Sequence, residues 1–186
     1  MRIISGIYKG RQIATTSGPG YRPATLKVRE ALFSMLEARG VTWPEARVLD
    51  LFAGSGSLAF EALSRGAATA CVVEKNRRAA GSISKTARSL GLDRGQFQVV
   101  TGDVQRFLHR PVTTRYDVVF VDPPYGQGVL LPALETLTSS GWLAPEAFVV
   151  AEVEAQLNPG PNTPAGLVME VDRLYGQTRI CIWQAQ

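Results

Sequence analysis

From residue 48 onward, short apolar segments alternate with segments whose apolar residues recur at helical spacing. Parallel strands need crossover connections, usually helices, so this alternation predicts a doubly wound α/β fold with helices on both faces of the sheet. The last two apolar segments flank a turn at Tyr175-Gly176-Gln177 and predict a C-terminal antiparallel hairpin. The expected sheet is mostly parallel and seven-stranded, with strands at 48–52, 70–74, 97–100, 116–121, 147–152, 167–172 and 178–183 and helices at 57–65, 77–90 and 132–138.

The residues before this alternation have a different pattern. Segments 2–4 and 7–13 are rich in β-branched residues and predict a short hairpin or ribbon. A helix is expected over about 25–39, because its apolar residues fall on one face and a glycine follows it. We therefore expect an N-terminal β-hairpin arm at 1–24, followed by the α/β domain at 25–186.

A glycine-rich loop, Asp50-Leu51-Phe52-Ala53-Gly54-Ser55-Gly56, follows the first expected strand. Glycine lets the backbone turn sharply and approach a ligand closely, and the next helix adds free amide donors at its N-terminus. Glu74 ends the second strand about twenty residues after the glycines, where a carboxylate can bind ribose hydroxyls. Asp103 ends the third strand and is placed to accept a hydrogen bond from an adenine amino group. The pattern predicts a site for a nucleoside cofactor.

Two kinds of cofactor are compatible with this loop. Gly54, Gly56 and Ala59 satisfy the relaxed dinucleotide pattern, so a nicotinamide oxidoreductase is one interpretation. Asp50 argues against it, since a carboxylate beside the loop repels a pyrophosphate, and no side-chain pair is placed for hydride transfer. S-adenosylmethionine is a cation with a ribose and an adenine, and the acids at the strand ends favour it.

The tetrapeptide Asp122-Pro123-Pro124-Tyr125 follows the apolar segment 116–121. Ligands of open α/β sheets bind at the carboxyl ends of the strands, which is where this tetrapeptide is expected. The prolines remove two backbone donors and stiffen the chain. A carboxylate, free carbonyls and an aromatic ring then lie together, a set suited to holding a planar base by its amino group.

The first 29 residues carry basic side chains and no acidic ones, although the whole chain has a formal net charge of only +4. A basic N-terminal segment on a nearly neutral body is typical of phosphate binding. The residues expected to contact RNA phosphates are Arg2, Lys9, Arg11, Arg22, Lys27 and Arg29.

Other residue types limit the location and the cofactors. Cys71 and Cys181 lie in apolar segments, which predicts buried thiols and a reducing cytosol. With a single histidine, His109, we expect no metal site. No apolar stretch is long enough to span a bilayer, and the N-terminus lacks the apolar core of a signal peptide, so a cytoplasmic protein without membrane contact is expected. The chain length of 186 residues and the lack of an obvious dimer helix favour a monomer.

Taken together, these motifs resemble the class I methyltransferases, and more closely the RsmD family. The segments that carry the resemblance are 2–6, 9–11, 22–23, 28–33, 48–56, 61–67, 122–125 and 175–179, so it extends over the whole chain. The resemblance implies S-adenosylmethionine-dependent methylation of the exocyclic N2 of a guanine in 16S ribosomal RNA, of the guanine-966 type, within the assembled or assembling small subunit.

The resemblance also implies roles for particular residues. The catalytic residues are expected to be Asp122, Pro123, Pro124 and Tyr125. The residues expected to bind S-adenosylmethionine are Asp50, Phe52, Gly54, Ser55, Gly56, Glu74, Lys75, Asp103, Val104 and Asp122.

The chain departs from the family pattern in three places. Ala24-Thr25-Leu26-Lys27 replaces the usual Thr-Thr/Ser-Asp-Arg, which removes an acid from a loop expected to contact RNA. Thr86 replaces a common asparagine, and Ala59 replaces a glycine. Two further alternatives remain open beside the oxidoreductase: an amino-methyltransferase acting on adenine or cytosine in DNA or other RNA, and a non-catalytic RNA-binding module.

Overall fold

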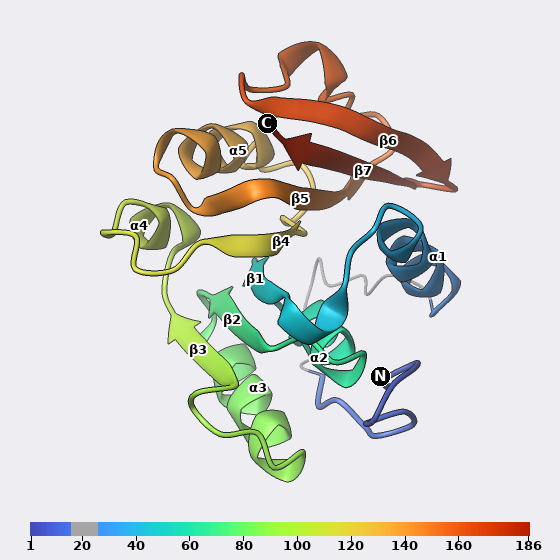
Figure 1. Cartoon of the computed structure of the whole chain (residues 1–186), viewed down its shortest axis with the longest axis vertical. Coiled ribbons are helices and arrows are strands. Elements are labelled where there is room, and N and C mark those ends of the chain that lie inside the picture. Colours follow the sequence, from blue (N-terminus) through green and yellow to red (C-terminus); the bar gives the residue numbers. More distant parts are fainter. Residues whose placement is uncertain (16–25) are drawn as a thin grey trace.

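The computed structural model describes residues 1–15 and 26–186, and its centre is a seven-stranded sheet (Figure 1). The strands lie in the order β3-β2-β1-β4-β5-β7-β6. The first five pair in parallel, and β7 is antiparallel to both β5 and β6. Their bounds are β1 Arg47–Leu51, β2 Thr69–Glu74, β3 Phe97–Thr101, β4 Tyr116–Val121, β5 Leu143–Glu154, β6 Leu167–Tyr175 and β7 Thr178–Ala185. The predicted doubly wound sheet with a C-terminal antiparallel hairpin is confirmed.

Helices cover both faces of this sheet, because each strand alternates its side chains between two apolar cores. Val118 and Phe120 of β4 lie in one core with residues of α1, α2 and α3, whereas Val119 and Val121 lie in the other with residues of α4 and α5. The helices are α1 Leu26–Glu37, α2 Ser57–Ser64, α3 Arg77–Ser89, α4 Val104–Leu108 and α5 Leu130–Ser139, with short 3-10 turns at Trp43–Glu45 and Gly160–Asn162.

The short helix α4 was not among the expected elements. It has five residues, too few for helical periodicity to show in the sequence. Asp103 begins it as an N-cap, since its carboxylate accepts a hydrogen bond from the Arg106 amide at 3.0 Å.

The N-terminal segment forms less β structure than predicted. The only bridge in residues 1–15 pairs Arg2 with Gln12, and residues 5–10 form turns instead of the start of a strand. Gly6 and Gly10 have φ of +79° and +80°, a left-handed conformation that an extended strand does not contain. The prediction of a strand over 7–13 is therefore wrong for 7–10.

Residues 1–15 lie against α2 and α3 through specific hydrogen bonds. The buried Glu61 carboxylate accepts from the amides of Ile4 at 2.7 Å and Ser5 at 3.0 Å. The Ile7 amide donates to the Ser64 carbonyl at 2.8 Å, and Thr86 accepts from the Ala14 amide at 3.3 Å. Thr86, one of the departures from the family pattern, thus holds the end of this segment on α3.

Both cysteines are buried with free thiols, as their apolar surroundings predict. Burial raises the pKa of the Cys71 thiol to about 11. Within residues 1–15 and 26–186, none of the helices combines the length and the apolar character needed to cross a membrane. In the same part of the chain, no three His, Cys, Asp or Glu side chains are grouped so as to hold a metal ion.

Candidate active site

Four carboxylates lie at the carboxyl edge of the sheet, on the face that α1, α2 and α3 cover. They are Glu74 of β2, Asp50 of β1, Asp122 directly after β4 and Glu152 of β5. The residues two positions before them, Val72, Val48, Phe120 and Val150, all lie in the core beneath these helices. Side chains two positions apart on a strand share a face. The alternation therefore directs all four acids to the same face of the sheet, around the switch point between β1 and β4, where open α/β sheets bind ligands.

The glycine-rich loop is held in an unusual backbone conformation by Glu74. Phe52, Gly54 and Gly56 have φ of 62°, 57° and 72°, and for Phe52 this left-handed conformation costs about 1–2 kcal/mol. The Glu74 carboxylate accepts from the Gly54 amide at 2.8 Å with one oxygen and from the Asn76 amide at 2.7 Å with the other. One carboxylate thus fixes the loop after β1 relative to the start of α3.

These residues fit a cationic nucleoside. Glu74 accepts two amide hydrogens, and a carboxylate has about four lone-pair sites, so two remain for ribose hydroxyls. Asp50 is 2% exposed, and its carboxylate accepts a long hydrogen bond of 3.4 Å from the Ala59 amide. Burial, together with the charge of Glu74, raises the pKa of Asp50 to about 7. A bound cation would favour the ionised form of this carboxylate.

The other residues predicted to contact the cofactor occupy varied positions. Lys75, directly after β2, and Asp103, the N-cap of α4, are both exposed. Ser55 is buried, with its hydroxyl 4.0 Å from the sulfur of Met1. The Val104 side chain is buried in the core beneath α4 and α5, so only its backbone is available to a ligand.

The Asp-Pro-Pro-Tyr segment joins the same edge. Asp122 is half-buried, and its amide lies 3.5 Å from the Leu51 carbonyl at the end of β1. Burial and the charges of Glu152 and Asp50 raise its pKa well above the ordinary range. Tyr125 is 38% exposed, and its hydroxyl lies 3.1 Å from the Thr178 hydroxyl of β7. Its ring is thus accessible while its hydroxyl is held.

Glu152 belongs to this site, although no sequence motif marks it. It is 5% exposed and follows Ala151, the register partner of Val121 on β4, so it neighbours Asp122 across the two strands. Burial raises its pKa to about 7, and the charge of Arg29 opposes that rise. The signal that could have found it is an acid at the carboxyl end of an apolar strand, the same signal that identified Glu74.

The structure corrects the role predicted for Arg29. Its side chain is 2% exposed on the inner face of α1, where Val28 and Leu32 are also buried, and it donates to the Arg2 carbonyl at 3.1 Å. A guanidinium in this position cannot contact an RNA phosphate. Its charge acts instead on Glu152, whose pKa it lowers. Arg22, another residue expected to bind phosphate, lies outside the described residues.

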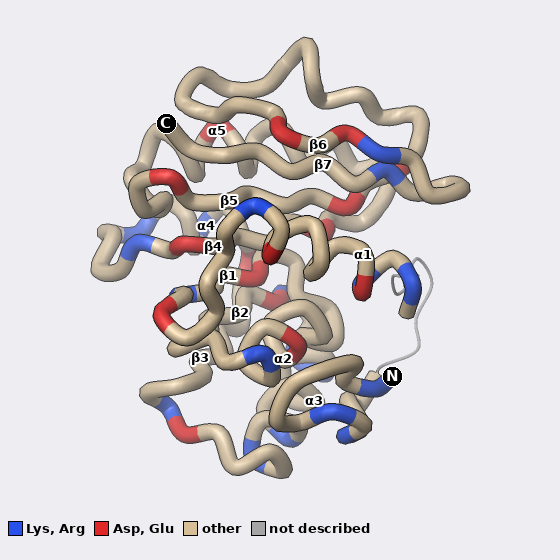
Figure 2. Tube along the Cα trace, turned by 45° about the vertical axis from the view of Figure 1, so that its right-hand side comes forward, with Lys and Arg blue, Asp and Glu red and all other residues tan. Residues whose placement is uncertain are grey.

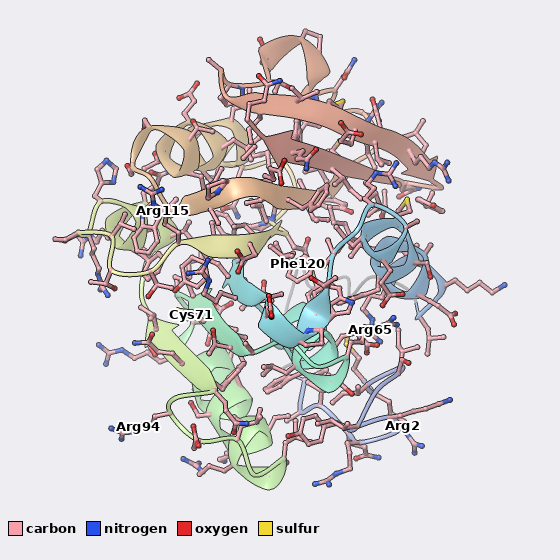
Figure 3. The ribbon with its side chains drawn as sticks, in the orientation of Figure 1. Arg2, Arg65, Cys71, Arg94, Arg115 and Phe120 are labelled. Atoms are coloured by element: carbon pink, nitrogen blue, oxygen red, sulfur yellow. The ribbon has the colours of Figure 1, made fainter. Side chains whose placement is uncertain are left out.

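The remaining predicted phosphate contacts, Arg2, Lys9, Arg11 and Lys27, are exposed. Arg2 points outward from the N-terminal segment (Figure 3). The Arg11 guanidinium donates to the Ser89 carbonyl at 2.6 Å, which brings the segment to the end of α3. That helix has no acidic residue, and basic positions gather along it and along the N-terminal segment (Figure 2). Its basic residues, which the sequence analysis missed, are Arg77, Arg78, Lys85 and Arg88.

A groove of about 400 Å³ lies at the opposite, amino-terminal edge of the strands. Its lining includes Arg47 and Asp117, which form an ion pair at 3.0 Å. None of the acids at the carboxyl edge lines it, so it is separate from the candidate active site.

Comparisons with known proteins agree over the whole chain. The family model described as conserved hypothetical protein 95 matches residues 1–184. The chain is 37% identical over 186 residues to ribosomal RNA small subunit methyltransferase D of Escherichia coli (strain K12), a match that covers 100% of this chain and 90% of that protein. It is 36% identical to the putative rRNA methyltransferase YlbH of Bacillus subtilis (strain 168), with 99% and 98% covered. The solved structure of the putative methyltransferase yhhF from Escherichia coli has a TM-score of 0.86 and 36% identity, with 100% and 98% covered.

Proposed function

This chain belongs to the RsmD family of ribosomal RNA methyltransferases, and on that premise we propose that it methylates the exocyclic N2 of a guanine in 16S ribosomal RNA. The methyl donor is S-adenosylmethionine. The proposal rests on the position of Asp122 at the same edge of the sheet as Asp50 and Glu74. A carboxylate that can bind an amine is thereby placed beside the residues that can bind the cofactor. The proposed target is the guanine-966 type of position in the assembled or assembling small subunit, modified by a monomer in the cytoplasm.

The cofactor would be held by residues of the first three strands. Glu74 accepts from the ribose hydroxyls with its free lone pairs, and Asp103 is available to the adenine amino group. Asp50 neutralises positive charge of the ligand in a site where its own ionisation is otherwise unfavourable. When bound, S-adenosylmethionine supplies an electrophilic methyl group.

Asp122 and Pro123 act on the guanine amine. The lone pair of this nitrogen is delocalised into the ring, so the free amine is a poor nucleophile. The Asp122 carboxylate and the Pro123 carbonyl accept its two hydrogens, which localises the lone pair and orients it. The same acceptors stabilise the positive charge that develops on nitrogen in the transition state. The raised pKa of Asp122 also suits its carboxylate to take up the proton that the methylated amine releases.

Tyr125 provides a surface for the base. Its exposed ring is available for stacking once the guanine leaves its neighbours in the RNA, a contact worth about 1–3 kcal/mol. The bond between its hydroxyl and Thr178 limits rotation of the ring, which reduces the entropy lost on binding.

Phosphate binding is assigned to the exposed basic residues of the N-terminal segment and α3. Arg2, Lys9 and Arg11 lie near the N-terminus of the chain, and Lys27 lies in the first turn of α1. These contacts position RNA and do not select the base. Selection must come from groups that touch the base itself.

The proposal is tested by transfer of labelled methyl from S-adenosylmethionine to unmodified small ribosomal subunits, followed by nucleoside analysis. We expect the label in N2-methylguanosine. Label in methyladenosine or methylcytidine would keep the reaction and overturn the substrate. Cofactor binding without label in any ribosomal nucleoside would point to another nucleic acid, and absence of cofactor binding would favour the non-catalytic RNA-binding module.

A further inference from the structure

The carboxyl ends of β4 and β5 bring two carboxylates side by side. Val121 of β4 is in parallel register with Ala151 of β5, and Asp122 and Glu152 directly follow these partners. Both acids face the side of the sheet that α1 covers, since Phe120 and Val150 two positions earlier lie in that core. The charge of Glu152 is among the causes that raise the pKa of Asp122, as expected of close neighbours. Any base amine held by Asp122 therefore lies next to Glu152.

Glu152 has an unused acceptor at this position. Its side chain is buried, and one of its two carboxylate oxygens, Oε2, has no hydrogen-bond partner among residues 1–15 and 26–186. Buried polar groups are rarely left unsatisfied, and an exception of this kind often marks a place where a ligand supplies the partner. A carboxylate can only accept when it is ionised, so the missing partner is a donor.

The three bases with exocyclic amines differ in the group that neighbours the amine. In guanine, N1 carries a hydrogen and is a donor beside N2. In adenine the corresponding neighbour of the amine is N1, and in cytosine it is N3. Both are acceptors without a hydrogen. A second carboxylate next to Asp122 therefore complements N1–H of guanine. It repels the lone pair on N1 of adenine or on N3 of cytosine.

We propose that Glu152 accepts a hydrogen bond from N1–H of the target guanine, and so determines which base the enzyme methylates. The inference rests on the proposed function, which it deepens from an amine-directed methyltransferase to one that selects guanine. Specificity arises both from the bond to guanine and from the unpaired charge that any other base would leave buried.

Arg29 supports this role from the opposite side. A neutral carboxyl would be able to donate a hydrogen to adenine N1 and would lose the discrimination, so Glu152 has to be ionised. Burial disfavours ionisation, whereas the buried Arg29 guanidinium on α1 favours it. The burial of Arg29, unexpected for an RNA-binding arginine, is explained if it keeps Glu152 charged.

The test uses a guanine analogue that lacks the N1 hydrogen. Small subunits are reconstituted with 16S RNA that carries either guanosine or 2-aminopurine riboside at the target position. 2-Aminopurine keeps the N2 amine, but it has an acceptor at N1 and lacks O6, so the change in preference in a Glu152 variant is what isolates the contact at N1. We expect the wild-type enzyme to prefer guanine by about 100-fold or more in kcat/KM, because a buried charged acceptor is left unpaired by the analogue. In Glu152→Gln the preference should fall to about 10-fold or less, since the amide can donate to N1.

Two variants separate base selection from structural damage. Glu152→Asp keeps the charge and should keep the preference for guanine at a lower rate. Glu170→Gln removes an exposed carboxylate from β6 and should change neither rate nor preference. An undiminished preference in Glu152→Gln, or equal wild-type rates on the two bases, would refute the role of Glu152 while leaving N2 methylation intact. Absence of wild-type methylation of the guanine subunits would instead refute the proposed function, and the inference with it.

Discussion

Three acids of the candidate site, Asp50, Asp122 and Glu152, share an unfavourable environment. Asp50 and Glu152 are buried and Asp122 is half-buried, and burial is the largest cause of the raised pKa in every case. Like charges close together add to this effect at Asp50 and Asp122. A structural role does not require such an arrangement, because neutral side chains would pack at lower cost. The acids are better explained by a ligand that brings positive charge and hydrogen-bond donors.

Asp50 should make stability depend on pH in a direction opposite to that of an ordinary carboxylate. Its pKa rises from 3.8 to about 7 on folding. Between these values the folded state binds more protons than the unfolded state, so stability falls as pH rises through this window. In Asp50→Asn this loss is absent. Relative to wild type, the free energy of unfolding of the variant should therefore rise by up to about 4 kcal/mol between pH 4 and pH 8. Urea unfolding of both cofactor-free proteins across this range measures the difference.

The same variant should bind the cofactor less tightly. A neutral asparagine side chain cannot neutralise a cation, so affinity for S-adenosylmethionine should fall by about 10-fold or more at pH 8, where wild-type Asp50 is ionised, and by less at pH 6. Titration calorimetry at the two pH values tests this. A stability difference between the proteins that stays constant with pH would show that Asp50 ionises normally.

Asp122 should be needed for transfer and far less for cofactor affinity. Asp122→Ala removes the carboxylate that accepts from the amine, and a reduction of about 100–1000-fold in single-turnover rate is expected. Asp122→Asn keeps one acceptor oxygen, so its single-turnover rate should fall by less. Equilibrium binding of S-adenosylmethionine to each variant serves as the control for folding. Wild-type turnover in Asp122→Ala would remove this residue from the mechanism.

At the scale of elements, periodicity was a reliable guide where segments were long. Each strand from β1 to β7 appears where apolar runs predicted it, although β5 begins earlier, at Leu143. The central strands β1 and β4 read as continuous apolar segments because both of their faces are buried. Helix α4 was missed because it is one turn long, and its N-cap Asp103 had been assigned only to the cofactor. The turns at 5–10 were missed because β-branched residues flank the two glycines that set the backbone. Local composition cannot show that Glu61 supplies the partners of that backbone from a distant helix.

The contact between the N-terminal segment and α2 yields a prediction with an internal control. A Cβ atom on Gly6 would lie 1.7 Å from the Ser64 carbonyl oxygen, whereas one on Gly10 would meet nothing within 4 Å. Both glycines have left-handed backbone, with φ of +79° and +80°, so both alanine variants incur about 1 kcal/mol of backbone strain. Gly6→Ala must also displace the N-terminal segment from α2, so its free energy of unfolding should fall by about 2–4 kcal/mol in total. Urea unfolding of the two variants measures this difference, and equal losses would mean that the contact adds no stability.

At the scale of the whole molecule, the sequence predicted which strand ends carry the site but not all of its residues. Asp50, Glu74 and Asp122 were identifiable because each follows or ends an apolar strand beside a recognisable motif. Glu152 lacks such a motif. Its proximity to Asp122 follows only from the register of β4 and β5. Arg29 looked like a surface cation because charged side chains are rarely buried, although it stands three, four and seven residues before the buried Leu32, Phe33 and Leu36. Burial separates it from Lys27, two residues away.

The distribution of charge over the molecule leads to the last prediction. Basic positions gather on the N-terminal segment and α3 (Figure 2), and their side chains are exposed, while the acids of the site are largely buried. Reversing Lys9 and Arg11 to Glu should weaken RNA binding and make it less dependent on salt. Each phosphate contact contributes about 0.7–0.9 to the slope of log K against log salt, so two losses should flatten it by about 1.4–1.8. Filter binding of 16S RNA between 50 and 200 mM salt, roughly the range in which such contacts dominate, measures the slope.

The control for that experiment must change the net charge equally. Reversing Arg110 and Arg115 also takes the formal net charge from +4 to 0, since each reversal changes it by −2. These arginines are exposed near α4 and the start of β4, and Figure 3 places Arg115 on the side of the molecule away from Arg2. If phosphates contact the surface formed by the N-terminal segment and α3, only the Lys9 and Arg11 variant should lose slope. Equal flattening in both double variants would mean that net charge, and not this surface, governs the attraction to RNA.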